Sequence, residues 1–158
     1  MKLIKYFIQF ISISFFFLLF KVLGLKISSI LSKNVFLLIG PFFRSKEIIE
    51  SNILKAIPNL NKEQIKKITN NMWGNYGRIL SEYIFIEKFR NSSLNNNLLI
   101  EGQEFLEKIR DEKNPVIFIS GHFNNFELMA MHLEKSGINL AAVYRPLNNK
   151  FLNFFMEK

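Results

Sequence analysis

A histidine and a glutamate lie five residues apart, directly after a short apolar run. The apolar run covers residues 115–119, and His122 and Glu127 follow it. An imidazole can take a proton from an attacking hydroxyl, while a carboxylate fixes its tautomer and stabilises the imidazolium that forms. Such a pair suits the transfer of an activated acyl group to an alcohol without a covalent enzyme intermediate. The spacing therefore makes His122 a candidate general base and Glu127 its orienting partner, with a plain surface or capping pair as the alternative.

The residues around His122 predict a turn. The run at 115–119 predicts a short buried strand, and apolar residues recur with helical spacing after the histidine. Residues five apart on one helix point about 140° away from each other, so His122 and Glu127 can meet only if the histidine lies in a loop. Gly121 allows close approach of a substrate or a positive φ. Gly121, Asn124 and Asn125 are the predicted substrate-binding residues of this loop.

Arg145 follows the next predicted strand, at the sheet edge where α/β folds bind ligands. Its guanidinium can hold a phosphate or carboxylate through two parallel hydrogen bonds. A simple salt bridge is the alternative interpretation.

The second half of the chain alternates between strand and helix patterns, which predicts an α/β fold with a βαβαβ parallel sheet and right-handed crossovers. Gly137 is a natural stop for the last of the helices between strands. The predicted strands cover residues 98–100, 116–119 and 138–144, and the predicted helices cover residues 103–110 and 126–135. A further apolar helix face is predicted over residues 149–158.

Residues 61–88 give the clearest helix pattern, with a capping box formed by Asn61 and Gln64. Gly74 and Gly77 inside this helix are each unfavourable by about 1 kcal/mol relative to alanine, which indicates close packing against another element. On this helix we expect Trp73 and Tyr76 to be core or interface residues. Arg78 and Glu82, four positions apart, are expected to form a surface ion pair.

Composition narrows the kind of site. The 158 residues include no cysteine and two histidines, which excludes thiol nucleophiles and makes a histidine-rich metal site improbable. His132, the second histidine, is expected on a helix surface. Residues 1–60 carry +6 of the net charge of +8. This distribution favours an anionic membrane surface over nucleic acid as the partner of the basic residues.

Residues 7–20 form a charge-free apolar run between Lys5 and Lys21. As a helix the run measures about 21 Å, shorter than a hydrocarbon core of about 30 Å. A tilted span and a helix embedded in one leaflet both remain open, and a signal peptide or a buried core helix is less favoured. We therefore expect an uncleaved membrane anchor over residues 1–30, with residues 35–43 as a second apolar patch on the same membrane surface.

Several motifs follow the amino-terminal anchor in a definite order, at residues 51–53, 56–58, 72–78 with Glu82, 100–102, 120–127 and 143–146. In this order they resemble the motifs of the lipid A biosynthesis late acyltransferases, the lauroyl/myristoyl transferases of the lysophospholipid acyltransferase superfamily. The wider superfamily often has Asp where this chain has Glu127, whereas the lipid A branch commonly uses Glu. The resemblance covers only the amino-terminal half of such proteins, with residues 31–158 as the amino-terminal part of the acyltransferase domain.

This resemblance implies transfer of a fatty acyl group from an acyl carrier protein thioester to a hydroxyl of a lipid A precursor. It implies His122 as base, Glu127 as its partner and Arg145 as a substrate-site cation. No cofactor or metal is implied. The implied location is the inner membrane, with the catalytic domain facing the cytoplasm.

Two other functions remain open at this point. A membrane-bound lipid hydrolase would use Ser120 or an activated water, although Ser120 lacks the Gly-x-Ser-x-Gly setting of a nucleophile elbow. A truncated, inactive or accessory membrane protein is the non-enzymatic alternative.

Overall fold

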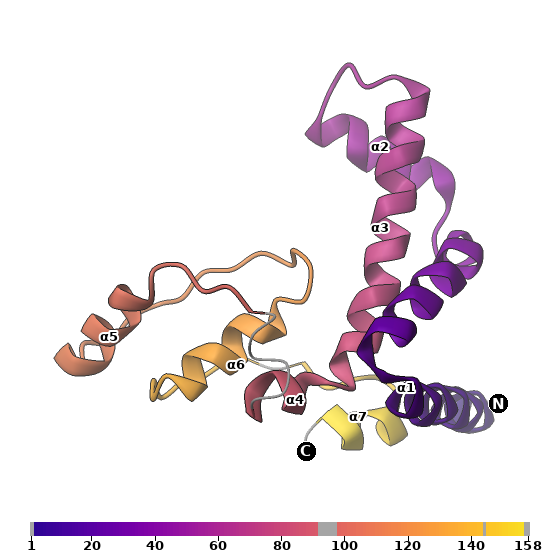
Figure 1. Ribbon diagram of the computed structural model, residues 1–158. Helices are drawn as coiled ribbons and strands as arrows, with labels where there is room; N and C mark the ends of the chain where they lie inside the picture. The colour runs from indigo at the N-terminus through magenta and orange to yellow at the C-terminus, as the bar shows by residue number, and fades with distance from the viewer. Residues whose placement is uncertain (1, 92–97, 144, 157–158) are drawn as a thin grey trace.

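The computed structural model describes residues 2–91, 98–143 and 145–156, and these are mainly helical (Figure 1). A long bent helix, α1, crosses the long helix α3. α2 lies beside one end of α3; α4, α6 and α7 lie towards its other end, and α5 lies farther out, beyond α6. The elements in chain order are α1 (Lys2–Ile39), η1 (Gly40–Phe42), α2 (Lys46–Ala56), α3 (Lys62–Tyr83), α4 (Ile86–Asn91), α5 (Gln103–Glu112), α6 (Glu127–Lys135) and α7 (Lys150–Met156).

The predicted βαβαβ sheet is wrong: the described residues contain helices and no strand. The described residues of the segments expected to be strands run as irregular chain, and apolar side chains that a sheet would bury are exposed; residue 144 lies outside the described residues. Ile117, Ile119 and Val143 are each at least 90% exposed. A strand exists only where a neighbouring backbone completes its hydrogen-bond ladder, and these short apolar segments form no such ladder with one another.

The helices predicted for the second half of the chain are present. α5 and α6 occupy the two segments expected between the strands, and α7 falls within the predicted carboxyl-terminal helix. Gly137 ends α6 with a φ of +83°, and its N–H donates to the carbonyl of Glu134 at 3.0 Å. A left-handed residue at this position is the usual glycine stop of a helix.

α1 consists of two helical limbs that meet at Gly24, which has a φ of +77° and a ψ of 165°. Such a backbone conformation strongly favours glycine. The break leaves carbonyls of the preceding turn without helical partners, and the buried Ser28 hydroxyl donates to the carbonyl of Phe20 at 2.9 Å. The first limb, residues 2–23, is about 33 Å long, comparable with a hydrocarbon core of about 30 Å.

The second limb of α1 packs closely against α3 because both contact faces carry small residues. Ser28 and Ser32 are buried on α1, and Gly74, Gly77 and Ser81 are buried on α3. A Cβ atom at Gly77 would lie 2.3 Å from the carbonyl oxygen of Ser32, so the two backbones nearly touch there. This confirms the close packing that the two glycines predicted.

α3 begins with the predicted capping box: Asn61 Oδ1 accepts from the Gln64 N–H, and Gln64 Oε1 accepts from the Asn61 N–H, both at 2.9 Å. Trp73 is buried, as expected, whereas Tyr76 is 53% exposed. The predicted surface ion pair within α3 is wrong. Glu82 forms no ion pair with the described cations and instead accepts a hydrogen bond from residue 125.

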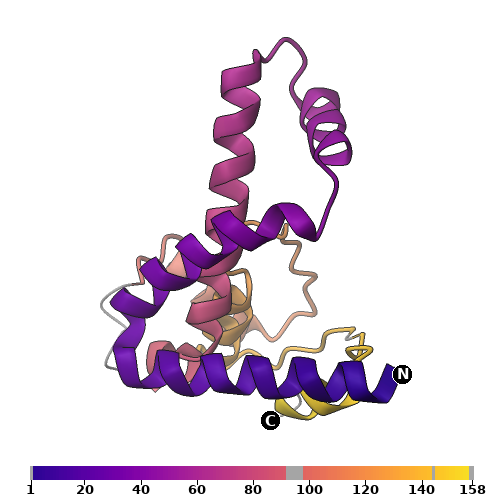
Figure 2. The ribbon, with the colours of Figure 1, turned by 90° about the vertical axis from the view of Figure 1, so that its right-hand side faces the viewer.

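α7 lies beside the first limb of α1 (Figure 2). Asn149 caps α7 by accepting from the N–H groups of Phe151 and Leu152, and its side-chain amide donates to the Tyr6 carbonyl at 3.0 Å. The Phe151 ring packs against two rings of α1, with a centroid separation of 5.9 Å from Phe7. Phe151, which belongs to the apolar face predicted near the carboxyl terminus, is therefore packed on α1.

The contact between α1 and α3 predicts opposite effects of two similar substitutions. Gly77→Ala should lower the free energy of unfolding by about 1–3 kcal/mol, because its Cβ would overlap the Ser32 backbone. Gly74→Ala is the matched control. Its Cβ would meet only the flexible side chain of Lys33 at 3.2 Å, so the variant should match or exceed wild-type stability. Denaturant unfolding in detergent followed by circular dichroism measures both, and equal stability of the two variants would contradict this packing.

Candidate active site

The candidate active site is the turn at residues 120–126 and the first residue of α6, Glu127. The segment before the turn is irregular chain rather than the expected strand, yet the turn still leads directly into a helix. His122 is exposed and Glu127 is half-buried. Glu127 is the first residue of α6, a position where the helix dipole favours a negative charge.

Two hydrogen bonds attach this turn to the carboxyl end of α3. The Tyr83 hydroxyl donates to Glu127 Oε1 at 3.4 Å, and the Asn125 side-chain amide donates to Glu82 Oε2 at 3.1 Å. Both contacts join residues more than 40 positions apart in the sequence. The end of α3 therefore positions the candidate orienting carboxylate.

Tyr83 and Glu82 are positioning residues that sequence reasoning does not find. The sequence pattern places Tyr83 on the apolar stripe of its helix and pairs Glu82 with Arg78. The contacts of both residues with the turn cannot be recognised from residue spacing in the sequence, because their partners lie on a different element more than 40 positions away. The one available signal is the occurrence of Glu82 among the motifs that carry the family resemblance.

Burial raises the pKa of Tyr83 from 10.0 to about 12, and the negative charge of Glu127 and its hydrogen bond to Tyr83 add to the effect. Tyr83 consequently remains a protonated donor to Glu127 throughout the neutral and mildly alkaline range. The pKa of Tyr83 is higher in the folded protein than in the unfolded chain. The contribution of its protonated hydroxyl to folding stability is therefore complete below pH 10, and it is lost as the pH rises towards 12.

His122 lies in the turn and Glu127 directly follows it, but no hydrogen bond joins the two side chains among the described residues. The imidazole instead packs on the ring of Phe126, with ring centroids 4.4 Å apart and planes inclined by 59°. The structure thus leaves the imidazole open to solvent, and the assignment of the two residues as a catalytic pair stays a prediction.

The other predicted site residues of the turn differ in exposure. Asn124 is exposed and takes the positive φ, +50°, that the sequence reasoning allowed for Gly121. A Cβ atom at Gly121 would lie 2.5 Å from the exposed ring of Phe123. Asn125 is 8% exposed, and its Oδ1 atom is buried without a hydrogen-bond partner in the described structure.

Arg145 is exposed in the irregular segment that follows residue 138, and it forms no ion pair with any described residue. The guanidinium is therefore available to an anionic group. The structure does not bring it into contact with His122 or Glu127, and its role as a substrate cation stays a prediction.

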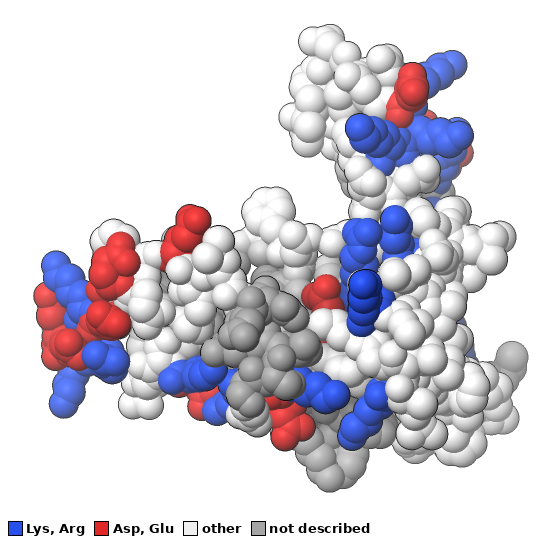
Figure 3. All heavy atoms as spheres, viewed as in Figure 1, with Lys and Arg blue, Asp and Glu red and all other residues white. Residues whose placement is uncertain are grey.

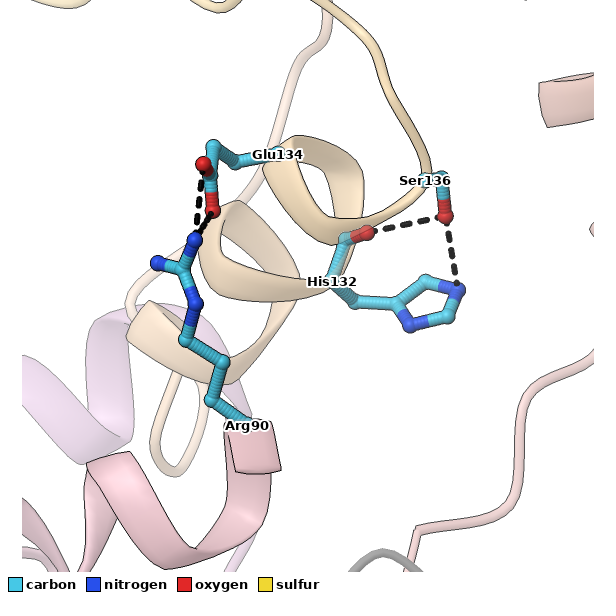
Figure 4. Close-up of polar contacts among 4 residues, drawn as sticks. All are labelled: Arg90, His132, Glu134 and Ser136. Carbon is cyan, nitrogen blue, oxygen red and sulfur yellow. Dashed lines mark hydrogen bonds and ion pairs between the residues drawn. The ribbon is translucent and has the colours of Figure 1, made fainter. Parts of the chain in front are cut away.

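Contacts on two opposite sides of α6 fix the orientation of this helix (Figure 4). Arg90 of α4 forms an ion pair with Glu134, with its Nη2 atom 2.6 Å from Oε2. His132 Nε2 lies 2.9 Å from Gln103 Oε1 of α5 and 3.4 Å from Ser136 Oγ. The second histidine is thus half-buried and engaged in structural hydrogen bonds.

Within the described ranges, no group of three or more His, Cys, Asp or Glu side chains is arranged to hold a metal ion.

By length and composition, one helical stretch of the described chain, Lys2–Phe42, is apolar enough to cross a membrane. Many of its apolar side chains are exposed, among them Leu3, Phe7 and Leu18. This helix can anchor the protein in a membrane.

Comparison with protein families places the chain among the acyltransferases. The model of the family described as bacterial lipid A biosynthesis acyltransferase matches residues 1–158. The chain belongs to this family, and its role is acyl transfer in the synthesis of lipid A. Comparisons with curated proteins and with solved structures gave no match.

The hydrogen bond between Tyr83 and Glu127 predicts a distinct phenol titration. In an ultraviolet titration, Tyr83 should ionise near pH 12, and Tyr83→Phe should remove this late step while leaving the other tyrosines unchanged. Glu127→Gln should lower the pKa of Tyr83, because the carboxylate charge no longer opposes phenolate formation. A late step that persists unchanged in both variants would show that the described contact does not form.

Proposed function

We propose that this acyltransferase moves a fatty acyl chain from an acyl carrier protein thioester to a hydroxyl of a lipid A precursor, with His122 as general base. The observation that carries the proposal is the exposed imidazole in a turn that leads into α6, whose first residue Glu127 is held by Tyr83. Family membership supports the reaction class and the lipid acceptor.

The proposed reaction needs no covalent enzyme intermediate. His122 takes the proton of the acceptor hydroxyl while its oxygen attacks the thioester carbonyl carbon. The tetrahedral intermediate then collapses, the carbon–sulfur bond breaks, and the imidazolium returns the proton to the leaving thiolate. Glu127 orients the imidazole and stabilises its positive charge, which requires the His122 ring to turn from Phe126 towards the carboxylate.

Arg145 and the polar groups of the turn supply the proposed contacts to substrate. The exposed guanidinium suits a phosphate of the acceptor, and Gly121 and Asn124 leave the backbone of the turn accessible. Asn125 contributes through its hydrogen bond to Glu82, which fixes the turn. We place the protein at the inner membrane with this site on the cytoplasmic side, where acyl carrier protein is found.

A hydrolase mechanism through Ser120 has less support. The Ser120 hydroxyl donates to the neighbouring Gly121 carbonyl at 3.3 Å, and no described base contacts it. The family match also favours transfer to a lipid acceptor.

The two histidines allow a matched test of the general base. Transfer of a labelled acyl chain from acyl carrier protein to a phosphorylated lipid A precursor should fall by about 10²–10⁴-fold in His122→Ala. His132→Gln, which preserves a polar partner for Gln103, should keep most of the activity. Equal helical content of the two variants by circular dichroism establishes that both are folded.

Retained transfer in His122→Ala would remove the imidazole from the mechanism. Absence of transfer by the wild-type 158-residue chain itself would favour the accessory interpretation over catalysis by this chain.

A further inference from the structure

Two cavities lie on either side of Trp73, at the end of α3 remote from the candidate active site. One has a volume of about 640 Å³ and the other about 830 Å³, and Arg44, Ile49 and Trp73 line both. Along α3, Lys62 is about 31 Å from Tyr83 and Tyr76 is about 10 Å from it. No residue of the turn at 120–127 lines either cavity, so the cavities are separate from the turn that carries His122.

The smaller cavity is strongly cationic. Arg44, Lys46, Lys62 and Lys66 line it, against the single carboxylate of Glu50. Glu50 is already paired with Lys46 at 3.6 Å, which leaves three cations without a carboxylate in this cavity. Figure 3 shows basic side chains gathered over this end of the molecule, where α2 and the start of α3 lie. A cavity of this composition fits a phosphate group.

The larger cavity is an apolar groove between α2, α3 and the end of α1. Its aromatic walls include Phe43, which is 72% exposed, and Tyr76, which is 53% exposed. Exposed apolar surface of this kind marks a binding groove rather than ordinary surface. The lining is completed by Phe36, Arg44, Ile49, Asn52, Ile53, Ala56, Ile57, Ile68, Met72 and Trp73.

Trp73 forms the wall between the two cavities. Gly40 makes room for its ring, because a Cβ atom there would lie 2.4 Å from the indole. The indole Nε1 atom is buried and has no hydrogen-bond acceptor among the described residues. Buried N–H groups are normally paired, and this unpaired one belongs to the residue that the two cavities share.

We propose that the two cavities together bind one anionic membrane phospholipid. Its phosphate lies among Arg44, Lys62 and Lys66, and one acyl chain lies in the apolar groove on the other side of Trp73. Because the cationic cavity and the apolar groove adjoin at Trp73, a ligand that fills both must have a charged head joined to a hydrocarbon chain. The groove also adjoins the carboxyl end of the second limb of α1, where Phe43 is an exposed apolar residue. This lipid is distinct from the substrates of the proposed reaction.

Trp73 is the only tryptophan in the chain, so it reports on this site alone. The full chain in detergent is titrated with phosphatidylglycerol whose acyl chains carry bromine, which quenches indole fluorescence at short range. Saturable quenching is expected, with brominated phosphatidylcholine much weaker because its headgroup has no net charge. Equal quenching by the two lipids would overturn the role of the cationic cavity.

Two pairs of variants test the two cavities separately. Lys62→Gln with Lys66→Gln should weaken phosphatidylglycerol binding on the order of tenfold or more, whereas Lys108→Gln on α5 should leave it unchanged. Asn52→Phe adds a ring inside the apolar groove and should reduce quenching, whereas Ser51→Phe adds the same ring on α2 outside either cavity. The same effect from both phenylalanine variants, or none from the double lysine variant, would overturn the proposal.

Two more measurements distinguish this lipid site from a free-anion site and from the candidate active site. Millimolar inorganic phosphate should not reverse the quenching, since displacement by phosphate alone would indicate a free-anion site rather than a lipid site. His122→Ala should be quenched like wild type, because it removes the proposed base and leaves both cavities intact. A variant that loses acyl transfer but keeps the quenching affects only the candidate active site, and a variant that loses the quenching but keeps acyl transfer affects only the lipid site. The two proposals can therefore fail separately.

Discussion

The close contact of α1 with α3 is the constraint on which the other features of the structure depend. Gly77 brings its helix to within contact of the Ser32 backbone, and buried serines on α1 leave room for that approach. Small residues at such a crossing contribute little apolar surface, but they allow two long helices to meet along their backbones. This crossing fixes the position of α3, which contacts α2 at one end and the turn before α6 at the other.

Each end of α3 then serves a different purpose. Glu82 and Tyr83 at its carboxyl end hold the turn that carries His122, so the candidate catalytic residues are placed by contacts from a distant part of the chain. Its amino-terminal half, with α2, builds the two cavities that share Trp73. The bent helix α1 connects both ends of this arrangement to a membrane-compatible first limb.

Features set by local interactions are predictable from the sequence, whereas those set by distant partners are not. The capping box of Asn61 and Gln64 and the glycine stop at Gly137 satisfy backbone groups of their own helices, so their residue types reveal them. A strand needs a partner backbone, and the apolar runs that predicted a sheet form no ladder in the described chain. The contact between Tyr83 and Glu127 joins residues 44 positions apart, and only the three-dimensional structure exposes it.

We propose that the turn acts in catalysis while it is held at the end of α3, and a cross-link between the two tests this. The chain has no cysteine, so Glu82→Cys with Asn125→Cys creates one unique pair for a short bismaleimide. The measurement is the rate of acyl transfer before and after cross-linking, relative to the same variant capped with a monomaleimide. Efficient cross-linking and an equal rate are the expected results. A cross-linked protein that has lost transfer, while the capped one retains it, would show that catalysis requires the turn to leave α3.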